Sequence, residues 1–142
     1  MRRSGGRVLK LAVCVVFSAA WLAACSSEPI TQDAFTRSAT EGASLVSAAS
    51  QTLSRVHGQI PTLTVDYGRG AFINYHELVL PIAESLPTLD GAPDQATVDQ
   101  LVDLLNQSVA ALAAPCLLPD CDWESQVRTF DETKDALLAA TE

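Results

Sequence analysis

Basic residues, histidine and methionine are scarce in this 142-residue chain, which holds nine Lys and Arg residues, two His residues and one Met residue. Four of the nine basic residues lie within the first ten positions, whereas all 17 acidic residues lie at position 28 or beyond. From residue 25 onward, five basic residues face 17 acidic ones, which gives this part of the chain a formal charge of −12. Such a surface repels phosphate groups, so nucleic acid is not an expected partner.

The sequence also lacks the short motifs of common enzyme sites. It holds no G-x-S-x-G and no P-loop, and the glycines of residues 68–70 lack the later glycine and the preceding strand of a dinucleotide-binding turn. His76 and Glu77 match only the first two positions of H-E-x-x-H, because Leu80 stands where the second histidine is needed. We therefore predict that the protein is not an enzyme and holds no cofactor.

The two histidines, His57 and His76, are candidates for a haem or metal site between helices, as other helix bundles have. If the helices that carry them are antiparallel, the two side chains lie about 8–15 Å apart along the axis, too far for one metal ion. Met1 is the only methionine, and no C-x-x-C-H run is present, which argues against His/Met or covalent haem attachment. We predict no metal site and interpret both histidines as partly exposed helix residues.

The first 24 residues have the order of a secretory signal peptide. Residues 1–10 are basic, and residues 11–24 carry no charge. An uncharged run of this length rises only about 21 Å as a helix, less than the roughly 30 Å that a permanent membrane span must cross. The leader therefore predicts export and removal of residues 1–24.

The uncharged run ends in Leu22, Ala23, Ala24 and Cys25, and polar residues follow at once, beginning with Ser26. This order of a large apolar residue, two small residues and a cysteine resembles the lipobox of bacterial lipoproteins. The resemblance covers residues 1–27 and implies that a diacylglyceryl group is attached to Cys25 and that a peptidase cuts after Ala24. Two or more acyl chains make anchoring durable, since each buried methylene adds about 0.8 kcal/mol.

Two questions on the leader stay open at this point. Ordinary cleavage after Ala24 is the alternative to lipidation and would leave a soluble secreted protein. The place of the anchor depends on the host, because Ser26 resembles the sorting residue of outer-membrane lipoproteins in bacteria with two membranes. In a host with one membrane, the protein would sit on the outer face of the cytoplasmic membrane.

Residues 25–32 are interpreted as the lipidated cysteine with a tether, and residues 33–142 as one acidic helical domain. The first helix of this domain is expected to start at Thr31 or Thr36 and to end at His57. Apolar or small residues recur along it at intervals of three and four, the pattern of a helix face that packs against other helices. This face consists of Phe35, Ala39, Gly42, Val46, Ala49, Leu53 and Val56.

A second helix is predicted after residues 59–70, which hold Pro61, Gly68 and Gly70 and are interpreted as a connection. Pro81 has no amide proton to donate to the carbonyl one turn earlier, so a kink is expected in this helix. The apolar face of the second helix is formed by Phe72, Tyr75, Val79, Ile82 and Leu86.

Two further helices complete the predicted fold. The turn-forming residues 87–93 precede a helix that starts near Pro93, has Asp94 in its first turn and ends at Pro115, and Asp122 is expected to cap the last helix. The inward-facing residues are Val98, Leu101, Val102, Leu105, Val109 and Leu112 in the third helix, and Trp123, Val127, Phe130 and Leu137 in the fourth. Because short loops favour antiparallel neighbours, the predicted fold class is all-α, a small up-down four-helix bundle.

Cys116 and Cys121 are the two cysteines that follow the lipobox, while Cys14 lies in the leader. In an exported protein the expected state is a disulfide, and its small loop contributes about 2 kcal/mol in the chain-entropy model. A redox-active pair is one alternative, although the spacing is not C-x-x-C and no βαβ pattern surrounds it. Zinc is another, but only Asp120 and Asp122 stand near as further ligands.

These observations together favour a non-enzymatic role. Tyr67 lies off the apolar faces beside Arg69 and is the aromatic residue expected to contact a partner. We expect a membrane-anchored, non-enzymatic protein with a structural or protein-interaction role in the cell envelope. The alternative is an envelope lipoprotein that binds a small ligand between its helices, in a pocket that the kink at Pro81 opens and in which Arg69 or His76 supplies the polar contact.

Overall fold

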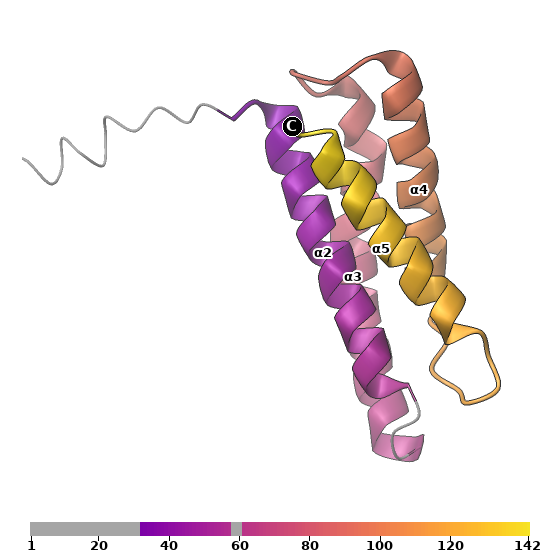
Figure 1. The fold of residues 1–142 in the computed structure, drawn as a ribbon. Coiled ribbons are helices and arrows are strands. Elements are labelled where there is room, and N and C mark those ends of the chain that lie inside the picture. Colours follow the sequence, from indigo (N-terminus) through magenta and orange to yellow (C-terminus); the bar gives the residue numbers. More distant parts are fainter. Residues whose placement is uncertain (1–31, 58–60) are drawn as a thin grey trace, which may run out of the picture. The chain divides into compact units, whose positions relative to one another are not determined.

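Helices make up nearly all of the chain that the computed structural model describes, which comprises residues 32–57 and 61–142, with only the backbone given for residues 61–67. Figure 1 shows the elements in order of the sequence, and no strand occurs among the described residues. The elements are α2 (Ala34–Val56), α3 (Pro61–Ser85), the short 3-10 helix η1 (Leu86–Thr88), α4 (Gln95–Ala113) and α5 (Trp123–Ala139). The predicted all-α class and four helices are confirmed, whereas the predicted leader and lipobox lie outside the described residues.

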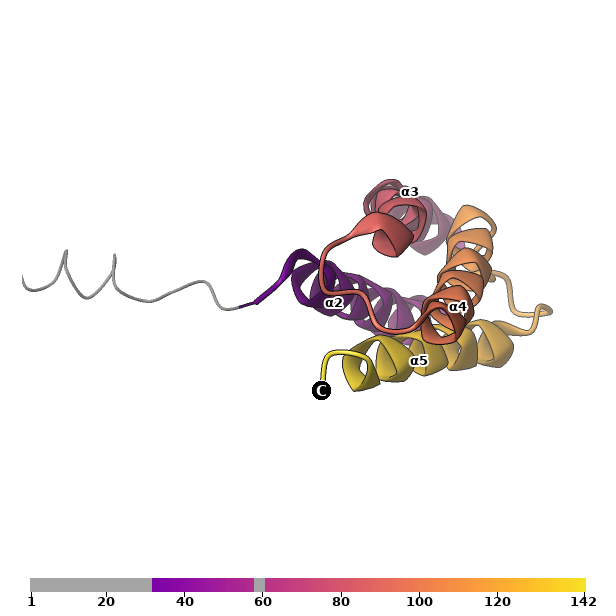
Figure 2. The ribbon, with the colours of Figure 1, turned by 90° about the horizontal axis from the view of Figure 1, so that it is seen from above.

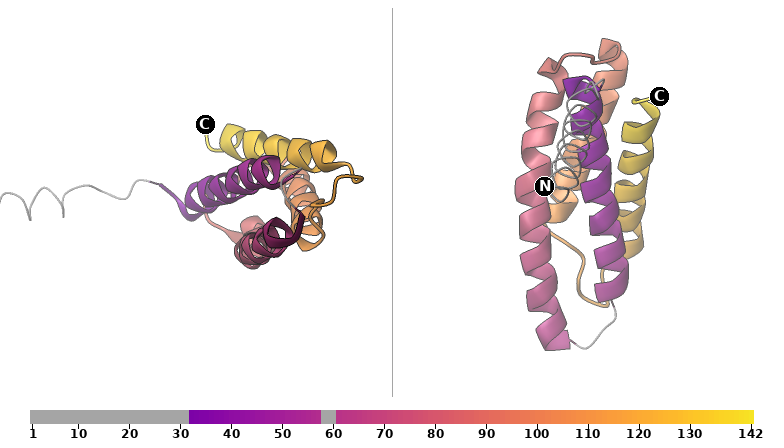
Figure 3. Two further views of the ribbon diagram at one scale, coloured as in Figure 1. Left: turned by 90° about the horizontal axis from the view of Figure 1, so that it is seen from below. Right: turned by 90° about the vertical axis from the view of Figure 1, so that its left-hand side faces the viewer.

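The four helices form an up-down bundle in which each one runs antiparallel to its neighbours (Figures 1 and 3). Seen from above, they stand in a ring in the order of the sequence, with α5 beside α2 (Figure 2). The contacts agree, since α2 packs on α3, α3 on α4, α4 on α5, and α5 closes the ring on α2. Residues 32–142 form one compact unit, and the described residues of this unit share a hydrophobic core.

Three aspartates cap the starts of α2, α4 and α5. The Oδ1 atoms of Asp33, Asp94 and Asp122 accept hydrogen bonds from the backbone N–H groups three residues later, at 2.7, 3.0 and 3.1 Å. A capping carboxylate satisfies an N–H group that has no partner within the helix. The predicted cap at Asp122 is confirmed, but Asp94 precedes the first turn of α4, and Asp33 rather than Thr36 marks the start of α2.

The apolar faces predicted from residue spacing form the core. All seven residues assigned to the face of the first helix are buried. Of the face predicted for the second helix, Tyr75 is half-buried and Phe72, Val79 and Ile82 are buried on α3, whereas Leu86 is buried in η1. The remaining two helices follow the same pattern, with Val98, Leu101, Leu105, Leu112, Phe130 and Leu137 buried and Val102, Val109, Trp123 and Val127 half-buried.

The predicted connection over residues 59–70 is wrong, because α3 already begins at Pro61 and runs for 25 residues. Proline suits the first position of a helix, where its missing N–H group has no partner to lose. Gly68 lies inside the helix and is buried, and a Cβ atom built there would stand 3.1 Å from Val56 and 3.3 Å from Leu117. Close packing therefore explains a glycine that by sequence alone resembles a helix breaker.

The second helix also continues through Pro81, which lies four residues before its last residue, Ser85. The kink expected there stays a prediction. No helix in the described part of the chain combines the length and the apolar character that crossing a membrane requires.

Candidate functional site

A disulfide and two side-chain hydrogen bonds fix the loop that joins α4 to α5. Cys116 and Cys121 form a disulfide with their Cα atoms 5.7 Å apart, which confirms the predicted bridge. Cys116 is buried and Cys121 is half-buried. We call the end of the bundle that carries this loop the disulfide end, and the opposite end, where α2 begins and α5 finishes, the N-terminal end (Figure 1).

Gln126 in the first turns of α5 ties the same loop to the helix. Its Nε2 atom donates to the carbonyl oxygen of Ala114 at 2.9 Å, and its Oε1 atom accepts from the backbone N–H of Cys116 at 2.7 Å. Both hydrogen bonds flank Pro115, so one side chain holds the backbone on either side of the proline. Sequence reasoning missed Gln126, since a glutamine on a helix carries no signal of the loop that it will meet.

An aromatic contact joins the end of α2 to the start of α5. The rings of His57 and Trp123 are stacked, with centroids 4.6 Å apart and planes inclined by 23°. The Nε2 atom of His57 is buried and has no hydrogen-bond partner among the described residues. His57 thus belongs to the packing of the disulfide end, while His76 lies half-buried on α3. No group of three potential metal ligands occurs within residues 32–57 and 61–142.

Hydroxyl groups link the helices further along the bundle. The hydroxyls of Ser108 on α4 and Thr133 on α5 are both buried and lie 2.8 Å apart. Ser50 on α2 donates to Oδ1 of Asp131 on α5 at 2.8 Å. Such satisfied polar contacts favour one arrangement of neighbouring helices over others, because a shifted helix would leave buried groups without partners.

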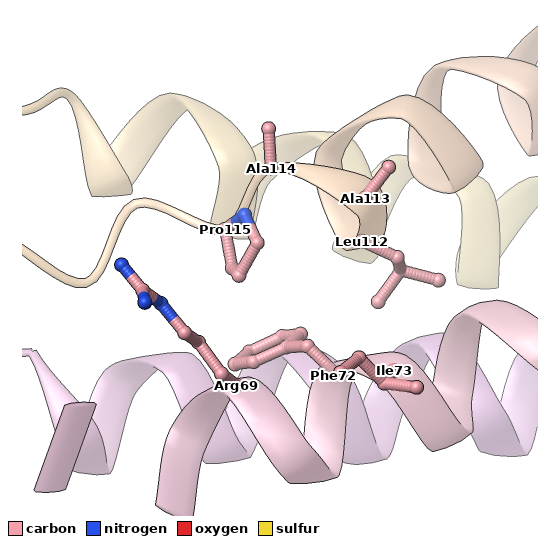
Figure 4. A pocket seen from close by; sticks show the side chains of 7 residues that line it. All are labelled: Arg69, Phe72, Ile73, Leu112, Ala113, Ala114 and Pro115. Carbon is pink, nitrogen blue, oxygen red and sulfur yellow. The ribbon is translucent and has the colours of Figure 1, made fainter. Parts of the chain in front are cut away.

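A hollow of about 300 Å³ lies between α3 and the C-terminal end of α4. Figure 4 shows its lining side chains, with Phe72 lying between Arg69 and Ile73 and the guanidinium of Arg69 to the side of Pro115. The lining residues are Arg69, Phe72, Ile73, Leu112, Ala113, Ala114 and Pro115. The hollow lies where α4 ends, because Pro115 cannot continue that helix, whereas the first turns of α3 extend beyond the end of α4.

The position of this hollow differs from the predicted pocket. Arg69 lines it as predicted, but His76 and Pro81 do not. At 1.5 Å per residue, Pro81 lies about 12 Å further along α3 than Ile73. The sequence prediction places Arg69 in a pocket opened by a kink in α3, whereas the hollow that Arg69 lines lies at the end of α4. The side chain of Tyr67, the predicted partner contact, lies outside the described part of the structure.

The fold and these contacts define the chain's class as an all-α up-down four-helix bundle with one disulfide in its last loop. No family model matches the chain, and neither curated proteins nor solved structures yield a significant match to it.

Proposed function

We propose that the protein is a lipid-anchored component of the cell envelope with a non-enzymatic role in protein interaction. The observation that carries the proposal is the position of Cys25, directly after Leu22-Ala23-Ala24, at the end of an uncharged run and before polar residues. The basic start of the leader supports export, and the disulfide suits an oxidising compartment outside the cytoplasm. In a host with two membranes, Ser26 favours the outer membrane.

The length of the tether indicates which part of the bundle the anchor would hold near the membrane. Seven residue steps separate Cys25 from Gln32, the first described residue. A fully extended chain spans at most about 3.3–3.6 Å per residue, so the tether would reach about 25 Å. The tether leads to the start of α2, and the 23 residues of α2 rise about 35 Å from there to the disulfide end. Because this rise exceeds the reach of the tether, the anchor would hold the N-terminal end near the bilayer and leave the disulfide end free to lie further away.

Charge supports a role at a distance from the lipid surface. The formal charge of −12 from residue 25 onward disfavours contact with anionic headgroups, so we propose that membrane attachment depends on the acyl chains alone. Near the disulfide end, Ile73 and Leu118 expose 57% and 61% of their surface. Large exposed apolar side chains beside a rigid loop favour this end as the contact surface for an envelope protein.

Detergent phase partitioning of the full chain expressed in a bacterial host tests the anchor. The wild type is expected in the detergent phase and in the membrane fraction after a high-salt wash, whereas Cys25→Ser is expected in the aqueous phase. Cys14→Ser is the matched control, because it changes a cysteine of the leader that processing would remove. An aqueous wild type, or a Cys25→Ser protein that stays with the detergent, would contradict the proposal.

Site-specific photo-crosslinking tests the interaction role. A photoreactive residue at Leu118 is expected to give a discrete adduct in native membranes, whereas the same residue at Thr88, at the N-terminal end, is not. Both side chains are exposed, so access of the crosslinker is matched. Adducts at Thr88 alone would overturn the assignment of the contact surface.

A further inference from the structure

The hollow beside Arg69 has the composition of a small-ligand site. Its volume of about 300 Å³ lies at the lower end of the range for ligand pockets. Phe72 and Leu112 are almost wholly buried at its base, and Ile73 leaves more than half of its surface exposed at its edge. An apolar group of a few carbon atoms would cover the exposed side chain of Ile73 and remove its surface from water.

The charge of the hollow is opposite to that of the chain. Arg69 is the single charged residue among the described side chains of its lining, although acidic residues outnumber basic ones 17 to nine in the whole sequence. Arg69 is exposed, and its guanidinium lies at the edge of the hollow, to the side of Pro115 and directed away from Ile73 (Figure 4). A planar guanidinium pairs with a carboxylate through two parallel hydrogen bonds.

The lining also restricts the kind of anion that fits. One guanidinium balances a single negative charge, and the other described side chains of the lining are apolar, so they offer a phosphate dianion no partners for its other oxygens. The C-terminal end of a helix disfavours anions, so the carboxylate must lie at Arg69 and not over the end of α4. A compact monocarboxylate with an apolar tail meets both conditions.

Both walls of the hollow are held in place before any ligand arrives. On one side, the disulfide and the two hydrogen bonds of Gln126 fix the backbone around Pro115. On the other side, Gly68 packs tightly against Leu117 and Val56, next to Arg69. Binding to a rigid site costs less conformational entropy than binding to a mobile one.

We propose that this hollow binds a small monocarboxylate with a short acyl chain, the carboxylate pairing with Arg69 and the chain covering Ile73. The inference does not depend on the lipid anchor, because every residue that it uses lies within the compact unit of residues 32–142. Loss of the anchor and absence of ligand binding are therefore separate outcomes.

Titration of residues 32–142 with octanoate, followed by amide chemical shifts in nuclear magnetic resonance spectra, tests the site. Saturable shifts are expected at Ile73 and Ala113. Octanamide, a neutral ligand of nearly the same shape, is expected to bind roughly tenfold more weakly, because it cannot form the charge-assisted pair. Arg69→Gln should lower octanoate affinity by a similar factor, and Ile73→Ser should lower the affinities of both ligands.

Arg128→Gln is the matched control, since Arg128 is an exposed arginine on α5 that does not line the hollow. Its octanoate affinity is expected to equal that of the wild type. The proposal is overturned if octanoate causes no saturable shifts, if Arg69→Gln binds it as tightly as the wild type, or if the shifts gather instead at the exposed Leu78 and Leu138.

Discussion

At the N-terminal end of the bundle, the connection from α3 to α4 is held by backbone geometry and a carboxylate, whereas at the disulfide end the connection from α4 to α5 is held covalently. The backbone N–H of Phe35 donates to the carbonyl of Asp90 at 3.0 Å, and Gly91 lies directly against the carboxylate of Asp33. The disulfide end has its S–S bond, Gln126 and the stack of His57 on Trp123. We therefore expect the stability of the N-terminal end to depend on the backbone conformation at Gly91 and on pH, and the stability of the disulfide end to depend on the redox state of the two cysteines.

The largest effect is expected from Gly91, whose φ angle of 87° lies in the left-handed region. Gly91→Ala places a Cβ atom onto the carboxylate of Asp33 and strains the backbone, so the free energy of unfolding should fall by about 2–3 kcal/mol. Chemical denaturation monitored by circular dichroism measures the change.

Gly70→Ala is the matched control for this substitution, because a Cβ atom at Gly70, inside α3, would meet nothing within 4 Å. It should stabilise the protein by about 0.5–1 kcal/mol, the usual gain for alanine over glycine in a helix. If Gly91→Ala leaves stability unchanged, the N-terminal end is not held by this contact.

Removal of the disulfide is expected to have the next largest effect. The double variant Cys116→Ala, Cys121→Ala should lose about 2 kcal/mol of unfolding free energy, the chain-entropy value for a six-residue loop. Addition of a reductant should destabilise the wild type by a similar amount and leave the double variant unchanged. A wild type that is insensitive to reductant would show that Gln126 and the aromatic stack hold the loop alone.

Substitutions at Gln126 measure the contribution of its hydrogen bonds to stability apart from that of the disulfide. Gln126→Ala leaves the backbone N–H of the buried Cys116 without its acceptor, so we expect a loss of about 1–2 kcal/mol in urea denaturation. Gln126→Glu should lose less, because a carboxylate still accepts from Cys116, although it cannot donate to Ala114. Equal losses in both variants would indicate that the bond to Ala114 matters more.

Acid should act on the helix starts and not on the disulfide. Hydrogen bonds from the backbone and side chain of Thr36 lower the pKa of Asp33, and those from the side chain and backbone of Thr97 lower the pKa of Asp94, both from the ordinary value of 3.8. A carboxylate with a lowered folded-state pKa stabilises the fold above its unfolded pKa, and this stability is lost as the pH falls through the folded-state value.

The melting temperature is therefore expected to decrease modestly as the pH falls from about 5 to 2. The double variant Asp33→Asn, Asp94→Asn retains oxygen acceptors at both caps but has no carboxyl group to titrate there, so its decrease should be smaller. Asp103→Asn is the control, since Asp103 is exposed on α4 and caps no helix. Identical pH profiles for the wild type and the double variant would contradict a role of the caps in acid sensitivity.

Much of the fold could be predicted from the sequence, because periodic apolar residues such as Val46 and Leu105 report directly on which face of a helix is buried. The disulfide was also predictable, since only two cysteines follow the lipobox. The start of α3 was not, because Gly68 and Gly70 suggest a loop until the contacts of Gly68 with Val56 and Leu117 are known. At this position, packing between segments distant in the sequence outweighs the low helix propensity of glycine.

The candidate site was predictable only in part. Arg69 is conspicuous because basic residues are rare, but the hollow beside it depends on where α4 ends relative to α3, which is a property of the assembled bundle. Gln126 and the stacking of His57 on Trp123 depend on the same assembly. No short-range pattern in the sequence encodes such contacts.

The intact mass of the protein purified from its native membrane shows whether Cys25 carries a lipid. We expect a chain of residues 25–142 that carries a diacylglyceryl group on Cys25, with two thiols that react with an alkylating agent only after reduction. A mass equal to residues 25–142 without lipid, or to the full 142-residue chain, would contradict the anchor.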